Sequence, residues 1–260
     1  MDDATAPVWP DACPPAAHVQ ETIDRDGVCA APGPYTDAEL ASLRAAADAL
    51  LADAPGTLRR APRGLHAVRG LLVHARELCR AALAPELARR IEAVLGPGAQ
   101  AVRGILFDKP PAANWAVAWH QDRVIAVRDR ADLPGYGPWS RKDDHWQVTP
   151  PVGLLEGLLT VRVHLDDCAA DQGALRVVPG SHRLGLLPAE RCAPEVTLRP
   201  VWTCALPAGG VLLMRPLVLH ASSRAAIPCR RRVVHLELAP ASALAGLTWH
   251  EGPMNVRPDA

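Results

Sequence analysis

His120, Asp122 and His220 are the residue types that together ligate non-haem iron. His120 and Asp122 lie two positions apart in a strand-like segment, and positions i and i+2 of a strand point to the same side. Two histidines and one carboxylate bind Fe(II) on one face and leave the opposite positions open for a co-substrate and O2. His220, which ends the apolar run 210–219, is the candidate third ligand. The alternative for His220 is a core imidazole bonded to the backbone.

Arg231 is a candidate anion-binding residue in the next strand-like segment. Alternation along 231–238 places Arg231, Val233, His235 and Glu237 on one face. An arginine that faces an apolar interior is costly unless an anion pairs with it. A dicarboxylic co-substrate meets this need, because its far carboxylate accepts a guanidinium clamp while its 2-oxo acid end chelates the metal. Ser222 can add a hydrogen bond, and the alternative for Arg231 is a solvent-exposed position in the basic cluster 230–232.

Taken together, these residues resemble the phytanoyl-CoA dioxygenase family of Fe(II)/2-oxoglutarate oxygenases. The resemblance covers about residues 100–240 and rests on 119–122, 173–182, 220–223 and Arg231. It implies that the iron ligands and catalytic residues are His120, Asp122 and His220, and that Arg231 and Ser222 bind the far carboxylate of 2-oxoglutarate.

The resemblance also implies a reaction. Family members use Fe(II), 2-oxoglutarate and O2, release succinate and CO2, and hydroxylate an unactivated C–H. Halogenating relatives carry a small residue at the position of Asp122, which leaves room for chloride, so a carboxylate there favours hydroxylation or a related desaturation or cyclisation. Arg162 occupies a strand position that often contacts 2-oxoglutarate, with a structural ion pair to an aspartate as the alternative. Lys109 is a further candidate to hold a carboxylate, with a surface lysine as the alternative.

The candidate substrate-binding residues are Asn114, Trp119 and Trp139, which flank the proposed metal-binding strand and the segment 128–157. That segment is expected to be a long loop, and a loop carrying indoles suits closure over a small, partly apolar molecule. No coenzyme A site is evident. The alternative is that these tryptophans are ordinary core residues.

The elements that must position these residues change in character near residue 98. Residues 1–98 are expected to be mostly helical, with a capping box at 36–39 and a helix from Pro85 to Gly96. Residues 99–240 contain short strand-like runs separated by Gly, Pro and Asp, which favours a double-stranded β-helix of the jelly-roll, cupin-like type. We expect one domain, 1–260, with a C-terminal tail at 241–260. The expected strands are 101–107, 115–127, 158–165, 174–178, 210–214 and 231–238.

Composition limits the other possibilities. The 260 residues carry 28 basic and 28 acidic side chains, so net charge gives no reason to expect binding to nucleic acid or to an anionic membrane. The start of the chain lacks a signal-peptide pattern and no apolar run is long enough to span a membrane, so a cytoplasmic protein with a small-molecule substrate is expected. Two other functions remain: a cupin-like metalloenzyme that does not use 2-oxoglutarate, and a binding module with a decayed metal site.

Overall fold

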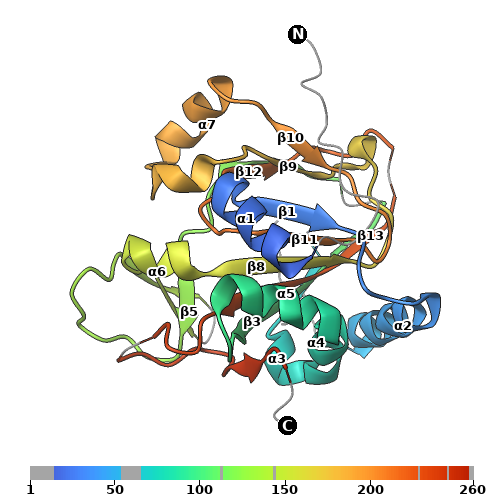
Figure 1. Ribbon diagram of the computed structural model, residues 1–260, viewed down its shortest axis with the longest axis horizontal. Coiled ribbons are helices and arrows are strands. Elements are labelled where there is room, and N and C mark those ends of the chain that lie inside the picture. The colour runs from blue at the N-terminus through green and yellow to red at the C-terminus, as the bar shows by residue number, and fades with distance from the viewer. Residues whose placement is uncertain are drawn as a thin grey trace.

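Two antiparallel sheets form the centre of the computed structural model, which describes residues 15–53, 66–111, 114–142, 145–227, 229–244 and 246–257 (Figure 1). The larger sheet has the order β1-β11-β8-β13-β3-β14, with β2 also paired to β3, and the smaller has the order β10-β9-β12-β4. The strands of the larger sheet are β1 (Val28–Ala31), β2 (His66–Arg69), β3 (Gln100–Lys109), β8 (Leu159–His164), β11 (Val211–Met214), β13 (Arg231–Ala239) and β14 (Met254–Asn255). Those of the smaller sheet are β4 (Val117–His120), β9 (Leu175–Val177), β10 (Trp202–Cys204) and β12 (His220–Ser222).

Helices from the N-terminal part cover one face of the larger sheet. Their aliphatic side chains pack with alternate residues of β8 and β13, including Val161, Val163, Val234 and Leu236, in the main hydrophobic cluster. The opposite face of the same strands is therefore free to carry polar side chains toward the smaller sheet. These helices are α1 (Ala16–Asp26), α2 (Asp37–Asp53), α3 (Leu71–His74), α4 (Arg76–Ala82) and α5 (Pro85–Leu95).

The expected helix signals are confirmed. The Thr36 N–H donates to Glu39 Oε2 at 2.8 Å, and the Glu39 N–H donates to Thr36 Oγ1 at 3.3 Å, which is the reciprocal pattern of a capping box. α5 begins at Pro85 and ends before Gly96. Within the part expected to be mostly helical, residues 71–82 form two helices, α3 and α4, which are divided at Ala75.

The prediction of a long loop over 128–157 is wrong. This segment contains β6 (Trp139–Lys142), β7 (His145–Val148) and α6 (Val152–Gly157), and β7 pairs with both β6 and β5 (Ile125–Val127) in a third sheet. The predicted single strand 115–127 is also wrong, because β4 ends at His120 and β5 belongs to the third sheet. Further elements that the sequence did not predict are α1, α7 (Ala189–Thr197), the 3-10 helices η1 (Ala170–Gln172) and η2 (Ser181–Leu184), and the strands β2, β10 and β14.

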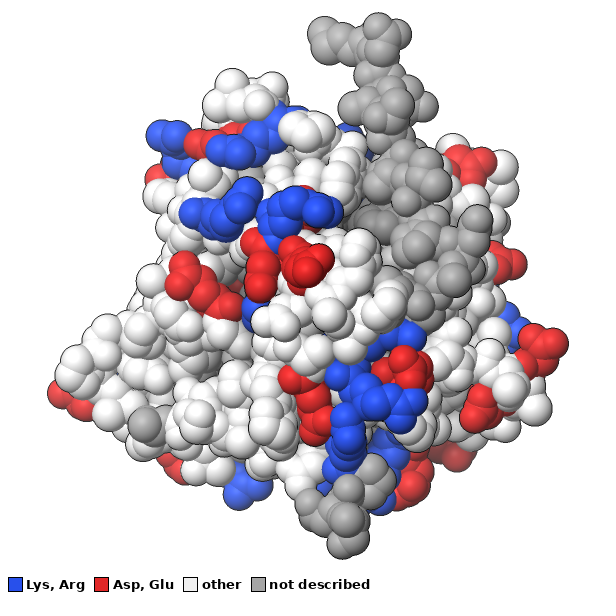
Figure 2. All heavy atoms as spheres, in the orientation of Figure 1, with Lys and Arg blue, Asp and Glu red and all other residues white. Residues whose placement is uncertain are grey.

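The fold class is as expected: mainly antiparallel β with flanking helices and a jelly-roll-like core, although strand pairing among the described residues does not close the sheets into a barrel. Within the described residues, no helix is long and apolar enough to cross a bilayer. Acidic and basic side chains are interspersed on the face of the molecule shown in Figure 2.

Candidate active site

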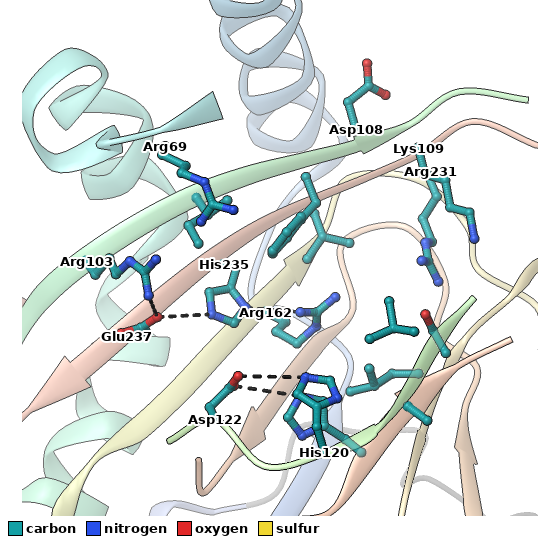
Figure 3. A pocket seen from close by; sticks show the side chains of 18 of the residues that line it. Arg69, Arg103, Asp108, Lys109, His120, Asp122, Arg162, Arg231, His235 and Glu237 are labelled. Carbon is teal, nitrogen blue, oxygen red and sulfur yellow. Dashed lines mark hydrogen bonds and ion pairs between the residues drawn. The ribbon is translucent and has the colours of Figure 1, made fainter. Parts of the chain in front are cut away.

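The two histidines of the candidate triad are direct cross-strand partners. In the antiparallel pair of β12 and β4, His220 lies opposite His120, and their ring centroids are 4.1 Å apart. His120 Nε2 lies 4.0 Å from Asp122 Oδ1, and His220 Nε2 lies 3.7 Å from Asp122 Oδ2. One ligand atom from each residue lies within 4.8 Å of the others (Figure 3). Residues 100 positions apart in the sequence therefore meet as one donor set.

Backbone contacts fix the orientation of both imidazoles. His120 Nδ1 lies 2.8 Å from the carbonyl oxygen of Ala118, and His220 Nδ1 lies 2.9 Å from that of Val218. A carbonyl oxygen only accepts, so each Nδ1 carries the proton and each Nε2 keeps its lone pair for a metal. Each imidazole thus presents its Nε2 toward Asp122.

Gln121 anchors the bend between the first two ligands. Its Nε2 donates to the carbonyl oxygens of Gly185 and Leu217, and its Oε1 accepts from the Leu187 N–H, each at 2.8 Å. The Asp122 N–H donates to the Pro216 carbonyl at 2.9 Å. His120 and Asp122 are thus held by side-chain and backbone anchors at the end of β4, and not by the continuous strand that the sequence suggested.

The donor set fits a divalent cation. Burial by itself raises the pKa of Asp122, but the imidazoles of His220, His235 and His120 together with Arg103 lower it overall. Burial lowers the pKa of His220, which favours the neutral imidazole that ligates metals. Two neutral imidazole nitrogens beside an ionised carboxylate form the 2-His-1-carboxylate set of non-haem iron sites.

A cavity of about 450 Å³ opens beside the triad between the two sheets. The four residues expected on one face of 231–238, namely Arg231, Val233, His235 and Glu237, all line it, which confirms the alternation. Arg231 and Lys109 are cross-strand partners at one end of the cavity, and Ser222 lies on its wall. Arg231 Nη1 donates to the Gly173 carbonyl.

Lys109 is a buried residue and not a surface lysine. It is 5% exposed, its Nζ donates to the Trp115 carbonyl at 2.9 Å, and the ammonium lies 4.7 Å from the centre of the Trp115 ring. Burial, followed by the neighbouring Arg231 charge, lowers the pKa of Lys109 to about 8. An anion between Lys109 and Arg231 would relieve this repulsion.

Arg162 lies in the middle of the cavity wall. Its Nη1 lies 3.0 Å from His235 Nδ1, and its guanidinium stands over the Phe107 ring at 5.6 Å. Burial and then Arg231 lower the pKa of Arg162 to about 10. Among the described residues it makes no ion pair with a carboxylate, so the alternative of a structural pair with an aspartate is not found.

The same residues fit 2-oxoglutarate. Arg162 Nε is buried and has no hydrogen-bond partner among the described residues, and neither Arg162 nor Arg231 is paired with a carboxylate there. Both guanidinium groups line the cavity that contains the triad. A buried cation without an anion is costly, so a dianion in this cavity supplies the missing partner.

Asn114, Trp119 and Trp139, the expected substrate-binding residues, are not among the residues that line this cavity, and their role in substrate binding stays a prediction. Trp119 packs near Val178 and Leu219, with Arg176 over its ring. The Asn114 side chain both donates to the Ala225 carbonyl and accepts from the Ala225 N–H, so it stabilises a loop. Trp139 packs edge-on against Trp146 in the third sheet. Nearness in sequence to β4 therefore did not predict which residues line the cavity, whereas Val124, Lys142 and Gln147, all later in the chain than Asp122, do line it.

Further residues line the cavity beside the expected metal and co-substrate residues. Trp115 and Phe107 line the cavity, as do Arg103 and Glu237, which form an ion pair of 2.7 Å between neighbouring strands. Glu237 was placed on the correct face, but it received no role. Its pairing with Arg103 depends on the register of β13 against β3, which the sequence does not reveal.

The sequence matches the family described as phytanoyl-CoA dioxygenase (PhyH) over residues 23–233. The chain belongs to the phytanoyl-CoA dioxygenase family. The expected family is therefore confirmed, and with it the enzyme class of iron- and 2-oxoglutarate-dependent dioxygenases. No curated protein matches the sequence.

Solved structures of similar fold come from the same class. EctD from S. alaskensis with bound Fe has a TM-score of 0.70 and 21% identity, covering 95% of this chain and 83% of its own. The epimerase SnoN in complex with Fe3+, alpha ketoglutarate and nogalamycin RO has a TM-score of 0.67 and 20% identity, covering 87% and 84%. The alpha ketoglutarate dependent carbocyclase SnoK, also from nogalamycin biosynthesis, has a TM-score of 0.68 and 18% identity, covering 93% and 90%. These neighbours support the fold.

Proposed function

We propose that this protein is a non-haem Fe(II)- and 2-oxoglutarate-dependent hydroxylase of a small molecule. His120 Nε2, Asp122 and His220 Nε2 hold the iron. When bound, iron and 2-oxoglutarate supply the oxidising power, with O2 consumed and succinate and CO2 released. The observation that carries the proposal is that the triad shares one cavity with Arg162 and Arg231, two arginines that lack a carboxylate partner among the described residues.

The protein's own part in the reaction is to bind and orient. Arg231, with Ser222 and Lys109 beside it, clamps the far carboxylate of 2-oxoglutarate, and Arg162 contacts the co-substrate along its length. This fixes the 2-oxo acid end toward the three ligands. The walls formed by Phe107 and the strand residues around it exclude water from the reacting groups.

The ligand set favours hydroxylation over halogenation. Asp122 supplies a carboxylate at the position where a chloride would otherwise need room, and the Gln121 contacts hold the Asp122 backbone in place. Related outcomes of the same C–H oxidation, namely desaturation and cyclisation, depend on the substrate bound.

The test is 2-oxoglutarate turnover by the purified protein with Fe(II) and ascorbate, measured as succinate formed. We expect substrate-independent turnover in the wild type and its loss in Asp122→Ala. Arg231→Ala is expected to raise the KM for 2-oxoglutarate at least about tenfold, since charge-assisted hydrogen bonds contribute roughly 1.5–3 kcal/mol. If Arg231→Ala leaves both turnover and 2-oxoglutarate affinity unchanged, a cupin-like enzyme that does not use 2-oxoglutarate is favoured instead.

A further inference from the structure

The cavity has a second group of charged side chains besides Lys109 and Arg231. Arg231 pairs across the sheet with Lys109, whereas Glu237 pairs with Arg103 six residues further along β13, a separation of about 20 Å at the rise of a β-strand. Figure 3 shows these two groups at opposite ends of the cavity, with Asp122, His120 and His235 between them. If the far carboxylate of 2-oxoglutarate is bound at the Arg231 end, the Arg103–Glu237 end is left for the substrate.

Arg103 and Glu237 are only partly satisfied by each other. Arg103 Nη1 donates to Glu237 Oε1 at 2.7 Å, and the two side chains are 12% and 18% exposed. Glu237 Oε1 also lies 4.0 Å from His235 Nε2. Within the described part of the chain, no other hydrogen bond reaches the remaining guanidinium N–H groups or Glu237 Oε2. Since both side chains line the cavity, these groups are available to a ligand.

An irregularity in the β13 backbone lies beside the Arg103–Glu237 pair. The register of β13 against β3 shifts between Glu237 and Leu238, as at a β-bulge, immediately beside the pair. Bulges redirect side chains and occur often beside active sites. A buried ion pair contributes little to stability relative to well-packed apolar residues, so stability alone does not explain a guanidinium and a carboxylate that both face an open cavity.

The chemistry of the pair defines what it can bind. The guanidinium fork matches a carboxylate, and a carboxylate oxygen accepts from an amine or a hydroxyl. Arg69 also lines the cavity, and Figure 3 shows it on the same side as Arg103. We infer that the substrate is a small carboxylic acid carrying an amino or hydroxyl group, with its carboxylate on Arg103 and its donor on Glu237.

This inference rests on the proposed function, because the opposite end must be filled by 2-oxoglutarate. It contrasts with an acyl thioester substrate, for which an apolar end would be the better match. Ile105, Val124 and Phe107 supply apolar contacts in the same cavity, so the carbon skeleton between the two polar groups has a suitable surface.

The test is calorimetric binding to the protein loaded anaerobically with Mn(II) and 2-oxoglutarate. The probes are the proteinogenic amino acids, the matching α-hydroxy acids, and an acyl-CoA. For each acid that binds, its methyl ester and its decarboxylated amine are titrated as well. We expect at least one acid to bind, and its ester and amine to bind at least about tenfold more weakly. Binding of the acyl-CoA but of no acid, equal binding of acid and ester, or no acid bound at all overturns the inference.

A double variant assigns the binding to the pair. Arg103→Gln with Glu237→Gln keeps two amides that can bond to each other and leaves no unpaired buried charge. We expect acid binding to weaken at least about tenfold while 2-oxoglutarate affinity stays within about twofold. The control replaces the exposed pair Glu77 and Arg80 by Gln and leaves both affinities unchanged. Unaltered acid binding in the cavity double variant overturns the inference, whereas failure of 2-oxoglutarate to bind the wild type overturns the proposed function.

Discussion

Glu251 gives the structure a specific dependence of stability on pH. Its Oε2 accepts the N–H groups of Leu72, in α3, and Gly104, in β3, both at 3.1 Å, so it ties a covering helix to the strand that carries Arg103. The residue is 7% exposed, and burial raises the pKa of its carboxyl from 4.5 to about 7. Glu251 therefore holds a proton in the folded protein at pH values where the unfolded chain has lost it.

The direction of this pH dependence follows from the number of protons that the folded and unfolded states bind. Because the folded-state pKa is the higher one, the contribution to stability is full below pH 4.5 and is lost as the pH rises through about 7. At about 1.4 kcal/mol per pKa unit, the total change is about 3 kcal/mol. Glu251→Gln retains an oxygen that can accept both N–H groups and removes the titration. We expect the free energy of unfolding of the variant, relative to that of the wild type, to rise by at least about 2 kcal/mol between pH 5 and pH 8.5.

The assay is urea unfolding of both metal-free proteins across that pH range. The other titrating groups are shared, so the difference between the two curves isolates Glu251. Glu77→Gln, at an exposed helix position, is the control. Its free energy of unfolding is expected to change with pH in parallel with that of the wild type. A constant difference between Glu251→Gln and wild type at all pH values would refute the reasoning.

Three further substitutions test the site and the core. Arg162→Gln is expected to weaken 2-oxoglutarate binding at least about tenfold with metal affinity retained, measured by calorimetry with Mn(II), and unchanged binding would remove Arg162 from the co-substrate site. Arg232→Met removes the guanidinium that lies 2.7 Å from Asp166. The free energy of unfolding, measured in urea, should fall by about 3 kcal/mol. A fall of less than about 1 kcal/mol would mean that solvent or Arg44 compensates the Asp166 charge. Leu213→Ala, in fully buried β11, should cost about 2–5 kcal/mol by the same assay, and a smaller loss would mean that the core closes over the space.

Most residues of the candidate site could be predicted because local sequence patterns indicate them. His120 and Asp122 are two positions apart, and the alternation of 231–238 placed Arg231 and Glu237 on the face that lines the cavity. The alternation of side chains depends only on strand geometry, so it can be predicted without knowing the partner strand. The family resemblance then joined these segments to His220, which no local pattern connects to His120.

The predictions that were wrong concern features that depend on contacts between distant segments of the chain. The third sheet was missed because β6 and β7 are short and polar, and their pairing with β5 cannot be recognised from any one segment alone. Trp119 and Trp139, which were expected to bind substrate, are not among the residues that line the cavity. Their indoles sit beside the metal-binding strand in sequence but pack into other clusters in space.

The proposed function requires that His120, Asp122 and His220 hold one divalent cation beside a diacid bound by Arg231. The most direct measurement is a crystal structure of the protein prepared without oxygen in the presence of Mn(II) and 2-oxoglutarate. We expect Mn(II) bound by His120 Nε2, His220 Nε2 and an Asp122 oxygen, with the Arg231 guanidinium on the far carboxylate of the chelated diacid. A cation bound elsewhere, or a diacid that leaves Arg231 without a carboxylate, would contradict it.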